Sequence, residues 1–534
     1  MDKSSRLSKL ILTVWLTLML LSLDTFYYTF LRAEHTDGYT GFLVGASMIF
    51  ISYFWLNGTK DLIYTLYFYL FCKKSYKTPS LNARWNSKAF RTKRPKVLLV
   101  YCTCNDFSGD SLLKSMNQTY KNIEVVILDD SNQKEYKTMV NAFGDQHNIK
   151  VIRRRSRVGF KAGNLNHYLK KAKFDYFVIL DSDEIIPRTY INRSLDYFAG
   201  NKAIGIVQAN HIATRNRNPF MKMFARGVDS HWPTYQMVKS SNGFLSLLGH
   251  GAMVSNECYQ ATGGFPHVVA EDLCFSIEAR NKGYFVAFAP DIICEEEYPI
   301  SYLAFKKRHS KWTQGNMEFI KTYTANILNA QMKWFEKFDI ILFTYNLPLH
   351  AFFSLFVAIN VILLPAVHYH LIYPLWMLIP TIIFLISPML NDMIYYFKEM
   401  RFKHLCWYLL HTLLLFGSMF FISLQSSLKS LVGGSTFIVT PKTNQLVNWR
   451  FAFKANMREL IFAFIILAIS TIMDGNPLPV IMIALPSIFS VYLARLANER
   501  KPLESRVTIG SLSSGAFSWL RSASLSAKTF LPFL

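Results

Sequence analysis

The sequence lacks any pair of cysteines spaced to bind a metal ion. Its seven cysteines form no Cys-x-x-Cys pair and match no zinc-site spacing; they are Cys72, Cys102, Cys104, Cys258, Cys274, Cys294 and Cys406. This pattern excludes the common cysteine-rich zinc modules. Because the number is odd and most of these residues lie in the central part of the chain, we expect reduced thiols in a cytosolic compartment.

The sequence also lacks a secretory signal and an internal repeat. The apolar run that begins at Leu10 has no small-residue cleavage site and is too long for a signal segment. The sequence is unusually apolar, because 51% of the 534 residues are hydrophobic. These hydrophobic residues cluster toward both ends of the chain. We therefore expect membrane-spanning segments at both ends of the chain, with a soluble region between them.

Acidic residues are scarce, since 35 Asp and Glu stand against 58 Lys and Arg, which gives a formal net charge of +23. Such a charge is compatible with binding to nucleic acid. However, the basic residues crowd beside apolar segments, as at 73–77 and 398–403, which is the positive-inside pattern of membrane proteins. The charge therefore predicts contact with anionic lipid and a diphosphate substrate, and no nucleic-acid partner.

Six apolar runs are predicted to cross the membrane as three hairpins: residues 10–31 with 41–56, 343–366 with 372–390, and 460–473 with 480–494. The basic clusters place the central domain and both termini on the cytoplasmic side of a plasma (inner) membrane. The predicted parts are an N-terminal hairpin (1–75), a cytosolic domain (76–338), a C-terminal membrane region (339–498) and a Ser-rich basic tail (499–534).

A seventh apolar run, at 405–428, conflicts with this arrangement. Basic clusters flank it on both sides, and both flanks cannot be cytoplasmic if the run crosses the membrane once. Gly417, Ser423 and Ser426 also weaken its apolar face. We therefore expect an interfacial or re-entrant helix here, followed by a basic cytoplasmic loop at 429–458.

The central region alternates short apolar runs with helical patterns. Strands are expected at 97–101, 124–128, 151–152 and 177–180, and helices at 109–118 and 161–172. This order predicts an α/β, doubly wound, Rossmann-like sheet. Two further stretches that mix aromatic and basic residues, 220–237 and 305–327, are expected to form helices against the membrane.

Acidic residues directly follow two of these strands. One strand ends in Asp181 and Asp183, and the other ends in Asp129 and Asp130. The carboxyl ends of strands in open α/β sheets are where ligands bind, and two carboxylates there can hold Mg²⁺ or Mn²⁺, which binds phosphates. A lone Asp-x-Asp is more often a solvated turn, but two acidic strand ends together predict a nucleotide-sugar site.

Two loops beside these acids complete the predicted donor site. Thr103 and Asp106 follow the first strand, where a loop would contact the base and ribose, although polar loops after strands are common. Lys161 opens a helix whose free N–H groups favour phosphate, and Gly163 keeps the backbone approachable. An ordinary helix start explains this second pattern equally well.

Glycines precede a further pair of acids, since Gly249 and its neighbour His250 lie upstream of Glu271 and Asp272. A carboxylate at the rim of a sugar site can take the proton from an acceptor hydroxyl, and we assign this role to Asp272, with Glu271 as the next candidate. The alternative is a charge pair at the N-terminus of a helix. The preceding glycines favour the catalytic interpretation.

The stretch 308–315 carries two cations and an indole ring. Arg308 and Lys311 can stabilise a departing diphosphate, and Trp312 offers a flat face on which a sugar ring can stack. The alternative is a basic amphipathic helix at the membrane surface. The two interpretations are compatible with each other.

Together these motifs resemble those of the processive family 2 glycosyltransferases, which include cellulose, hyaluronan, chitin and curdlan synthases. The resemblance covers about residues 95–495. The matching positions are the substrate-binding acids Asp129 and Asp130, the Lys-Ala-Gly-Asn at 161–164, the metal-binding Asp181 and Asp183, the base motif at 270–272 and the Gln-x-x-Arg-Trp motif at 308–312. In the last motif, Arg308 stands for the family's Gln and Lys311 for its Arg.

The resemblance also assigns a cytosolic gating loop. The family's Phe-x-Val-Thr-x-Lys pattern stands intact in this chain as Phe437, Val439, Thr440 and Lys442. A glycosyltransferase domain of the GT-A type, inserted between membrane helices, is the fold that the resemblance implies. The basic loop at 429–458 would then lie over the active site.

The activity implied is that of a metal-dependent, inverting hexosyltransferase. It would polymerise the sugar of a nucleotide-diphosphate donor, expected to be UDP-glucose, into a β-linked polysaccharide and export the product. Gly249, His250 and Trp312 would contact the growing polysaccharide, and accessory export or regulatory subunits are compatible with this activity. The alternatives are a non-processive transferase that acts on a lipid, and a transporter or channel whose cytosolic domain only binds nucleotide.

Overall fold

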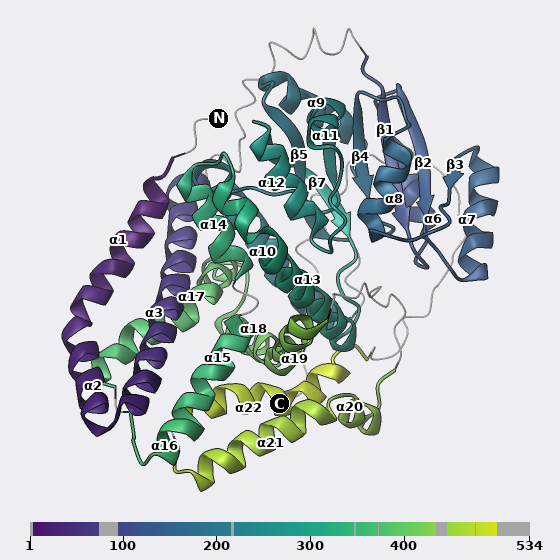
Figure 1. The fold of residues 1–534 in the computed structure, drawn as a ribbon. Coiled ribbons are helices and arrows are strands. Elements are labelled where there is room, and N and C mark those ends of the chain that lie inside the picture. Colours follow the sequence, from purple (N-terminus) through teal and green to yellow (C-terminus); the bar gives the residue numbers. More distant parts are fainter. Residues whose placement is uncertain are drawn as a thin grey trace. The chain divides into compact units, whose positions relative to one another are not determined.

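The central domain of the computed structural model contains a seven-stranded sheet in the order β3-β2-β1-β4-β6-β5-β7 (Figure 1). The structure describes residues 4–73, 94–214, 218–345, 349–371, 373–433, 446–475 and 477–498. The strands are β1 Val97–Thr103, β2 Ile123–Asp129, β3 Lys150–Ile152, β4 Tyr176–Leu180, β5 Ile204–Ala213, β6 Ala252–Ser255 and β7 Phe285–Glu296. All four predicted strands are present, and the predicted α/β class is confirmed.

Strands β3, β2, β1 and β4 run parallel to one another. Thr103 at the end of β1 lies opposite Asp129 of β2, and Tyr101 lies opposite Leu180 of β4. This register brings the carboxyl ends of the three longer strands to one edge of the sheet. The short strand β6 runs antiparallel to both β4 and β5, whereas β7 is parallel to β5. The sheet is therefore mixed and differs in its second half from a fully parallel, doubly wound sheet.

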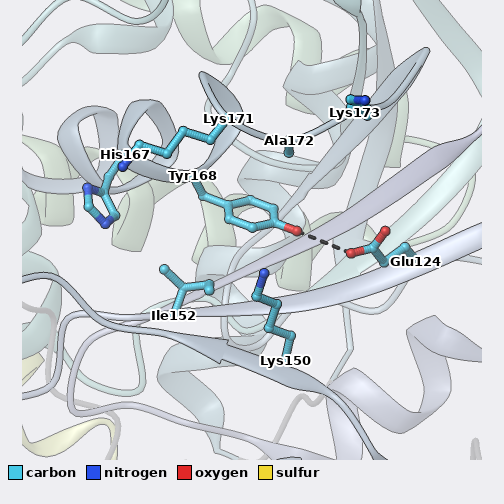
Figure 2. A pocket seen from close by; sticks show the side chains of 8 residues that line it. All are labelled: Glu124, Lys150, Ile152, His167, Tyr168, Lys171, Ala172 and Lys173. Carbon is cyan, nitrogen blue, oxygen red and sulfur yellow. Dashed lines mark hydrogen bonds between the residues drawn. The ribbon is translucent and has the colours of Figure 1, made fainter.

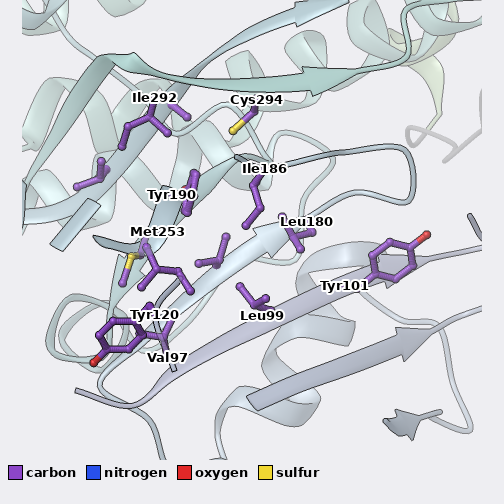
Figure 3. Close-up of a cluster of buried hydrophobic side chains, with 14 of the residues drawn as sticks. Val97, Leu99, Tyr101, Tyr120, Leu180, Ile186, Tyr190, Met253, Ile292 and Cys294 are labelled. Atoms are coloured by element: carbon purple, nitrogen blue, oxygen red, sulfur yellow. The ribbon is translucent and has the colours of Figure 1, made fainter. Parts of the chain in front are cut away.

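Helices cover both faces of this sheet, because alternate residues of each strand point to opposite sides. Leu99 and Leu180 lie in one buried apolar cluster (Figure 3), whereas Leu98 and Ile179 lie in another. The first cluster is completed by α6 Gly109–Met116, α7 Lys134–His147 and α9 Tyr190–Gly200, and the second by α8 Phe160–Leu169, α11 Asn256–Thr262 and α12 Glu271–Asn281. Both faces are thus packed, so we expect a ligand site at the strand ends.

Among the residues described, three helices are long and apolar enough to cross a membrane, or up to five if each of two bent pairs counts as one span. The three are Gly38–Cys72 (α3 Gly38–Tyr67 with its π-helical end), Leu375–Tyr396 (containing α17 Leu378–Tyr396) and Phe402–Val432 (α18 Phe402–Gly417 with α19 Phe420–Val432). The bent pairs are α1 Arg6–Leu21 with α2 Leu23–Thr36, at 51°, and α20 Trp449–Ala455 with α21 Met457–Ile472, at 64°. The length and composition of these helices indicate a multi-pass membrane protein.

The predicted spans differ from these helices in detail. The run 10–31 is divided at Ser22 between α1 and α2, and the run 41–56 is only part of a helix that continues to Cys72. The hairpin predicted from 460–473 and 480–494 corresponds to α21 and α22 Pro477–Arg495, and Asp474 lies between the two helices. The remaining short helices are α15 Leu349–Ala358, a π-helix Ile359–Leu363, α16 Leu364–Ala366 and a 3₁₀-helix Leu375–Met377. The number of crossings and the four-part division of the chain stay predictions.

The run at 405–428 forms most of α18 and α19, and its Ser423 and Ser426 contact the long helix α13 Tyr302–Asn329. The Ser423 hydroxyl lies 2.7 Å from Nε2 of buried His309, and the hydroxyls of Ser310 and Ser426 are also 2.7 Å apart. The polar residues that weaken the apolar face therefore bind another helix rather than lipid. That this segment forms an interfacial or re-entrant helix, and does not cross the membrane, stays a prediction.

Two further helices, α10 Pro219–Asn242 and α14 Trp334–Thr344, join the sheet to the membrane helices. The Tyr64 hydroxyl of α3 donates to Asp339 of α14 at 2.6 Å, and the backbone N–H of Phe244 donates to the same carboxylate at 2.8 Å. The predicted helices at 220–237 and 305–327 are thus found as α10 and α13. Helices α10 and α14 therefore hold the sheet domain against the membrane region.

Candidate active site

The predicted metal-binding acids lie where β4 ends, at the edge that β1 and β2 share. The Asp181 side chain is 41% exposed, whereas Ser182 between the two acids is buried and donates to Asp106 at 2.7 Å. One oxygen of Asp183 accepts the backbone N–H of Glu297 at 3.2 Å. The buried Ser182 anchors this turn, so Asp181 is presented to solvent as an oxygen ligand.

Lys161 reaches this strand end from the first turn of α8. Its ammonium contacts the Asp181 carboxylate and donates to the Gly249 carbonyl at 2.8 Å. Burial opposes the charge on Lys161, but Asp181 outweighs it and raises the pKa of the ammonium. A Cβ built at Gly163 would lie 2.1 Å from the Val158 carbonyl oxygen, so the glycine permits the close approach of loop and helix. The predicted Lys161 therefore joins two separate segments of the site.

Glu271 and Asp272 occupy the first turn of α12 and face the same region. A Cβ built at Gly249 would lie 3.3 Å from Oδ2 of Asp272, which places the pair beside the carbonyl bound by Lys161. Burial, and then the charge of Asp272, raise the pKa of Glu271 to about 7, and burial also raises the pKa of Asp272. The acids are a helix N-terminal pair, as the alternative interpretation held, and at the same time they belong to the site.

The acids predicted to contact the nucleoside are bound by groups of the protein itself. One oxygen of Asp106 accepts from the Thr103 hydroxyl at 2.9 Å and the backbone N–H of Cys104 at 2.7 Å. Asp129 and Asp130 pair with two arginines that follow β3, and we did not predict these arginines from the sequence. Arg153 donates to Asp129 at 2.6 Å, and Arg154 donates to Asp130 through two nitrogens at 2.9 and 2.6 Å.

Arg154 also organises the loop that leads into α8. It donates to the carbonyls of Val158 and Phe160, at 2.6 Å each. Because the same guanidinium binds Asp130, it connects the end of β2 with the start of the helix that carries Lys161. A run of basic residues at 153–157 was the only signal in the sequence that pointed to this role.

A buried polar cluster lies beneath the edge and contains His250, which we predicted as an acceptor-binding residue. Glu184 lies 2.9 Å from Nε2 of His211 and 3.0 Å from Nδ1 of His250, whose other nitrogen lies 3.3 Å from Glu296. Burial opposes both charges, but the pairing lowers the pKa of Glu184 to about 2 and raises that of His250 to about 10. The cluster thus fixes the loop 249–251 from below, with His250 as a buried imidazolium.

Within the part of the chain that the structure describes, Glu184, His211 and Cys294 also offer a carboxylate, an imidazole and a thiol whose atoms lie within 4.8 Å of one another. All three residues are fully buried, and the Cys294 thiol is held protonated because burial and Glu184 raise its pKa. Glu184 and His211 already bind each other. The exposed Asp181 is therefore a better ligand for a metal ion that arrives with a substrate.

Arg308 and Lys311, predicted to bind the diphosphate of the donor, and Trp312, predicted to bind the acceptor, lie on α13. The Arg308 guanidinium stacks over the Trp312 ring, 4.4 Å from its centre, and 40% of the Trp312 surface remains exposed. Burial lowers the pKa of Lys311, although the nearby Glu271 and Asp181 carboxylates oppose this shift. Lys311 therefore faces the acids of the site, whereas one face of Trp312 is covered by Arg308.

Two further predicted or observed features are not part of the described site. The predicted gating-loop residues Phe437, Val439, Thr440 and Lys442 fall outside the described residues. A pocket of about 350 Å³ lies at the amino end of the strands, where Tyr168 donates to Glu124 at 3.2 Å beside Lys150 (Figure 2). It is at the edge of the sheet opposite to Asp181 and is not part of the candidate active site.

Residues 176–473, more than half of the chain, match the family "Glycosyl transferase family group 2". The chain belongs to this family. The matched region begins with β4 and contains both aspartates of the metal motif, the Glu271–Asp272 pair and Lys311. This glycosyltransferase therefore carries its proposed catalytic groups within the region that defines the family.

Two curated relatives of the glycosyltransferase come from Arabidopsis thaliana. "Probable glucomannan 4-beta-mannosyltransferase 15" is 26% identical over 268 residues, which cover 47% of this chain and 48% of the relative. "Glucomannan 4-beta-mannosyltransferase 2" is 25% identical over 229 residues, which cover 41% and 43%. The chain thus matches about half the length of these relatives. Neither name supports glucose as the sugar, so the expected UDP-glucose donor stays a prediction.

Solved structures of glycosyltransferases also match. The mannosyltransferase PcManGT from Pyrobaculum calidifontis, in complex with GDP-Man and Mn²⁺, aligns with a TM-score of 0.41 and 19% identity over 69% of this chain and 99% of that chain. Residues 1–349 of TarS from S. aureus align with a TM-score of 0.34 and 15% identity over 57% and 93%. These structures are distant from the present one.

Proposed function

We propose that this family 2 glycosyltransferase is a processive, inverting hexosyltransferase that builds a β-linked polysaccharide from a nucleotide-diphosphate sugar. One observation carries the proposal: Asp181, Lys161 and the Glu271–Asp272 pair meet at one edge of the sheet, around Gly249. The edge thus offers carboxylates for a cation, an ammonium for phosphate and a base for the acceptor. These are the groups that transfer from a nucleotide-diphosphate sugar requires.

The donor side of the site fits a hard divalent cation, Mg²⁺ or Mn²⁺. Asp181 and Asp183 supply only oxygen ligands, and the Asp181 carboxylate is open to solvent. The bound cation would neutralise charge on the departing nucleoside diphosphate. Lys161, already held against Asp181, would contact the same diphosphate, and Thr103, Asp106, Asp129 and Asp130 would shape the nucleoside side.

On the acceptor side, Asp272 would take the proton of the attacking hydroxyl. The pair with Glu271 shares a raised pKa, so one carboxylate gains the basicity that proton transfer near neutral pH needs. Substituting Asp272→Asn should leave donor binding nearly intact and lower kcat by about 100- to 10,000-fold. A raised KM with unchanged kcat would instead make Asp272 a binding group.

The indole of Trp312 would contact the acceptor sugar, together with Gly249 and His250 of the loop 249–251. Because Arg308 covers one face of Trp312, only the remaining exposed surface is available to a pyranose ring. Trp312→Ala should therefore shorten the polymer while some donor hydrolysis persists. If polymer length per inserted molecule were unchanged, α13 would have only a structural role at the membrane surface.

The donor sugar and the product are tested together. Purified full-length protein in proteoliposomes is incubated with UDP-glucose, GDP-mannose and UDP-N-acetylglucosamine in turn, and nucleoside diphosphate release and product linkage are measured. The names of the curated relatives favour mannose, whereas the resemblance to the processive synthases implied UDP-glucose. A long β-linked polymer supports the proposal; a single-sugar lipid indicates the non-processive alternative, and an intact donor indicates the transporter.

The membrane region would export the product. We propose that the catalytic domain and both termini are cytoplasmic, that the loop at 429–458 gates the site, and that the polymer leaves between the helices that follow residue 338. The polar contacts between α13 and α19 support this arrangement, because they join the helix of Lys311 and Trp312 to the segment that precedes the gating loop.

A further inference from the structure

A groove of about 510 Å³ opens beside the short helix α20, where it meets α21 and α22. The residues that line it are Trp449, Arg450, Phe453, Lys454, Met457 and Val491. Helix α20 turns 64° away from α21 (Figure 1), so it lies across the end of this apolar helix instead of continuing it. The groove is therefore located at the end of a candidate membrane span.

Two rows of side chains run along α20 at a spacing of four residues. Trp449 and Phe453 form an apolar row on α20, and Met457, the first residue of α21, also lines the groove; 56%, 53% and 42% of their surfaces are exposed. Arg450 and Lys454 form a basic row one residue further along the chain. Because residues four apart lie on the same face of a helix, the groove has an apolar floor and a cationic rim. This pattern is typical of helices that lie in the interface of a bilayer.

The basic residues at the rim have no acidic partner within the part of the chain that the structure describes. Among the described residues, Arg450 and Lys454 form no ion pair, and the acid nearest to them in sequence, Glu459, is bound by Lys306 of α13. A third cation is close by, since the Arg495 guanidinium lies 4.0 Å from the centre of the Trp449 ring. The groove therefore offers positive charge beside exposed apolar surface.

We propose that this groove binds an anionic phospholipid. The acyl chain would lie along Trp449, Phe453 and Met457. The negatively charged phosphate of the headgroup would contact Arg450 and Lys454. Under the topology proposed above, α20 faces the cytoplasmic leaflet, where anionic lipids contribute to binding of basic segments. A lipid in this position would connect α20 with Val491 of α22 and so hold the end of the gating-loop region at the membrane surface.

The test measures lipid binding and needs no activity. Full-length protein is placed in nanodiscs of phosphatidylcholine, or of phosphatidylcholine and phosphatidylglycerol in equal parts, and bound lipid is counted by native mass spectrometry. The R450Q/K454Q variant should bind phosphatidylglycerol about 10- to 30-fold more weakly, because each base near an anionic surface contributes a factor of about five. A matched control, R401Q/K403Q, removes the same charge from exposed positions at the start of α18 and should bind like wild type.

A second variant tests the apolar floor without a change of charge. Val491→Phe fills the groove and should also lower phosphatidylglycerol binding, whereas the charge-preserving R450K/K454R should retain it. Unchanged binding in R450Q/K454Q, or an equal loss in R401Q/K403Q, would overturn the proposal in favour of diffuse attraction to the bilayer. If R450Q/K454Q does not fold, unchanged binding in Val491→Phe would overturn the proposal in the same way.

Discussion

At the scale of single residues, the two aspartates of the Asp181–Asp183 turn are held in different ways. Asp181 is bound by a flexible ammonium, that of Lys161, whereas Asp183 accepts a fixed backbone N–H from Glu297. A side chain fixed by backbone keeps its orientation when a cation arrives, and Lys161 can move from Asp181 toward a diphosphate. We therefore expect Asp183 to be the less replaceable of the two ligands.

The first prediction concerns this ligand. Asp183→Asn should reduce sugar transfer by about 100- to 1,000-fold, because a neutral amide binds a hard cation poorly and the charge on the leaving group is then less stabilised. Nucleoside diphosphate release is the measurement, and Asp145→Asn, the same change at an exposed position of α7, is the control. Full activity of Asp183→Asn, or of wild type in excess chelator, would contradict the metal assignment.

The second prediction concerns the Glu271–Asp272 pair. A base must be deprotonated to act, so the rate should rise with pH through the apparent pKa of the pair, about 7 for Glu271. Glu271→Gln removes one of two neighbouring charges and should move the midpoint of the kcat profile to lower pH. Glu278→Gln, on the same helix, should leave the midpoint in place. An unmoved midpoint in Glu271→Gln would assign the titration to another group.

The third prediction concerns the buried imidazolium of His250. Its pKa is raised to about 10, so its contribution to stability is fully present below the unfolded value of about 6.5 and is lost as the pH rises through 10. Wild type should therefore lose stability between pH 7 and 10. His250→Gln should be less stable at pH 7 and lose less over this range. Apparent unfolding temperatures in detergent provide the measurement, and parallel curves for the two proteins would refute the charge assignment.

The sequence pointed to some site residues and not to others, for a physical reason. Asp129, Asp181 and Lys161 follow a strand or open a helix, so their neighbours in sequence place them at the sheet edge. Glu184 gains its role from His211 and His250, which are 27 and 66 residues away. Nothing local in the sequence records such partners. The resemblance to the family 2 glycosyltransferases likewise rested on the motif residues and did not include the buried residues that support them.

At the scale of elements, the strands β1 to β4 were predicted from the sequence, whereas the strands β5, β6 and β7, the strand directions and the helix bends were not. An apolar run of four residues does not encode whether β6 runs parallel or antiparallel to its neighbours. The break at 10–31 depends on Ser22, whose hydroxyl donates to the Leu18 carbonyl at 2.7 Å and competes with the helical hydrogen bonds. One serine in an apolar run is a weak signal, because most serines in helices do not bend them.

The fourth prediction belongs to the contact between α13 and α19. Ser423→Ala removes the hydroxyl that binds buried His309 and should cost on the order of 1 kcal/mol, or more if the imidazole finds no other partner. Ser427 is equally buried on the same helix, but its hydroxyl has no partner among the described residues. Ser427→Ala is therefore a matched control that should cost little. Equal losses of thermal stability would show that the serines act only through packing.

At the scale of the whole molecule, the sequence predicted an α/β domain between apolar ends, and the structure has an α/β sheet with long apolar helices on both sides of it in the chain. The sequence did not decide how the segment containing α18 and α19 meets the membrane. This helical pair is long and apolar enough to cross, yet half of its most apolar window is buried inside the protein and its Ser423 and Ser426 bind α13. The basic residues on both sides favour an interfacial or re-entrant path.

The last prediction tests that path directly. In a background in which the partly exposed Cys102 and Cys104 and the exposed Cys406 are replaced by serine, a cysteine is introduced in place of Lys403, Arg450 or Asp474, and intact cells are treated with a membrane-impermeant maleimide. If both flanks of α18 and α19 are cytoplasmic, the cysteines at 403 and 450 should react only after the membrane is opened. The cysteine at 474, in the turn between α21 and α22, should react from outside and serves as the positive control. Labelling at 450 but not at 403 would show a true crossing, and the loop at 429–458 would then be separated by the membrane from the site that it is proposed to gate.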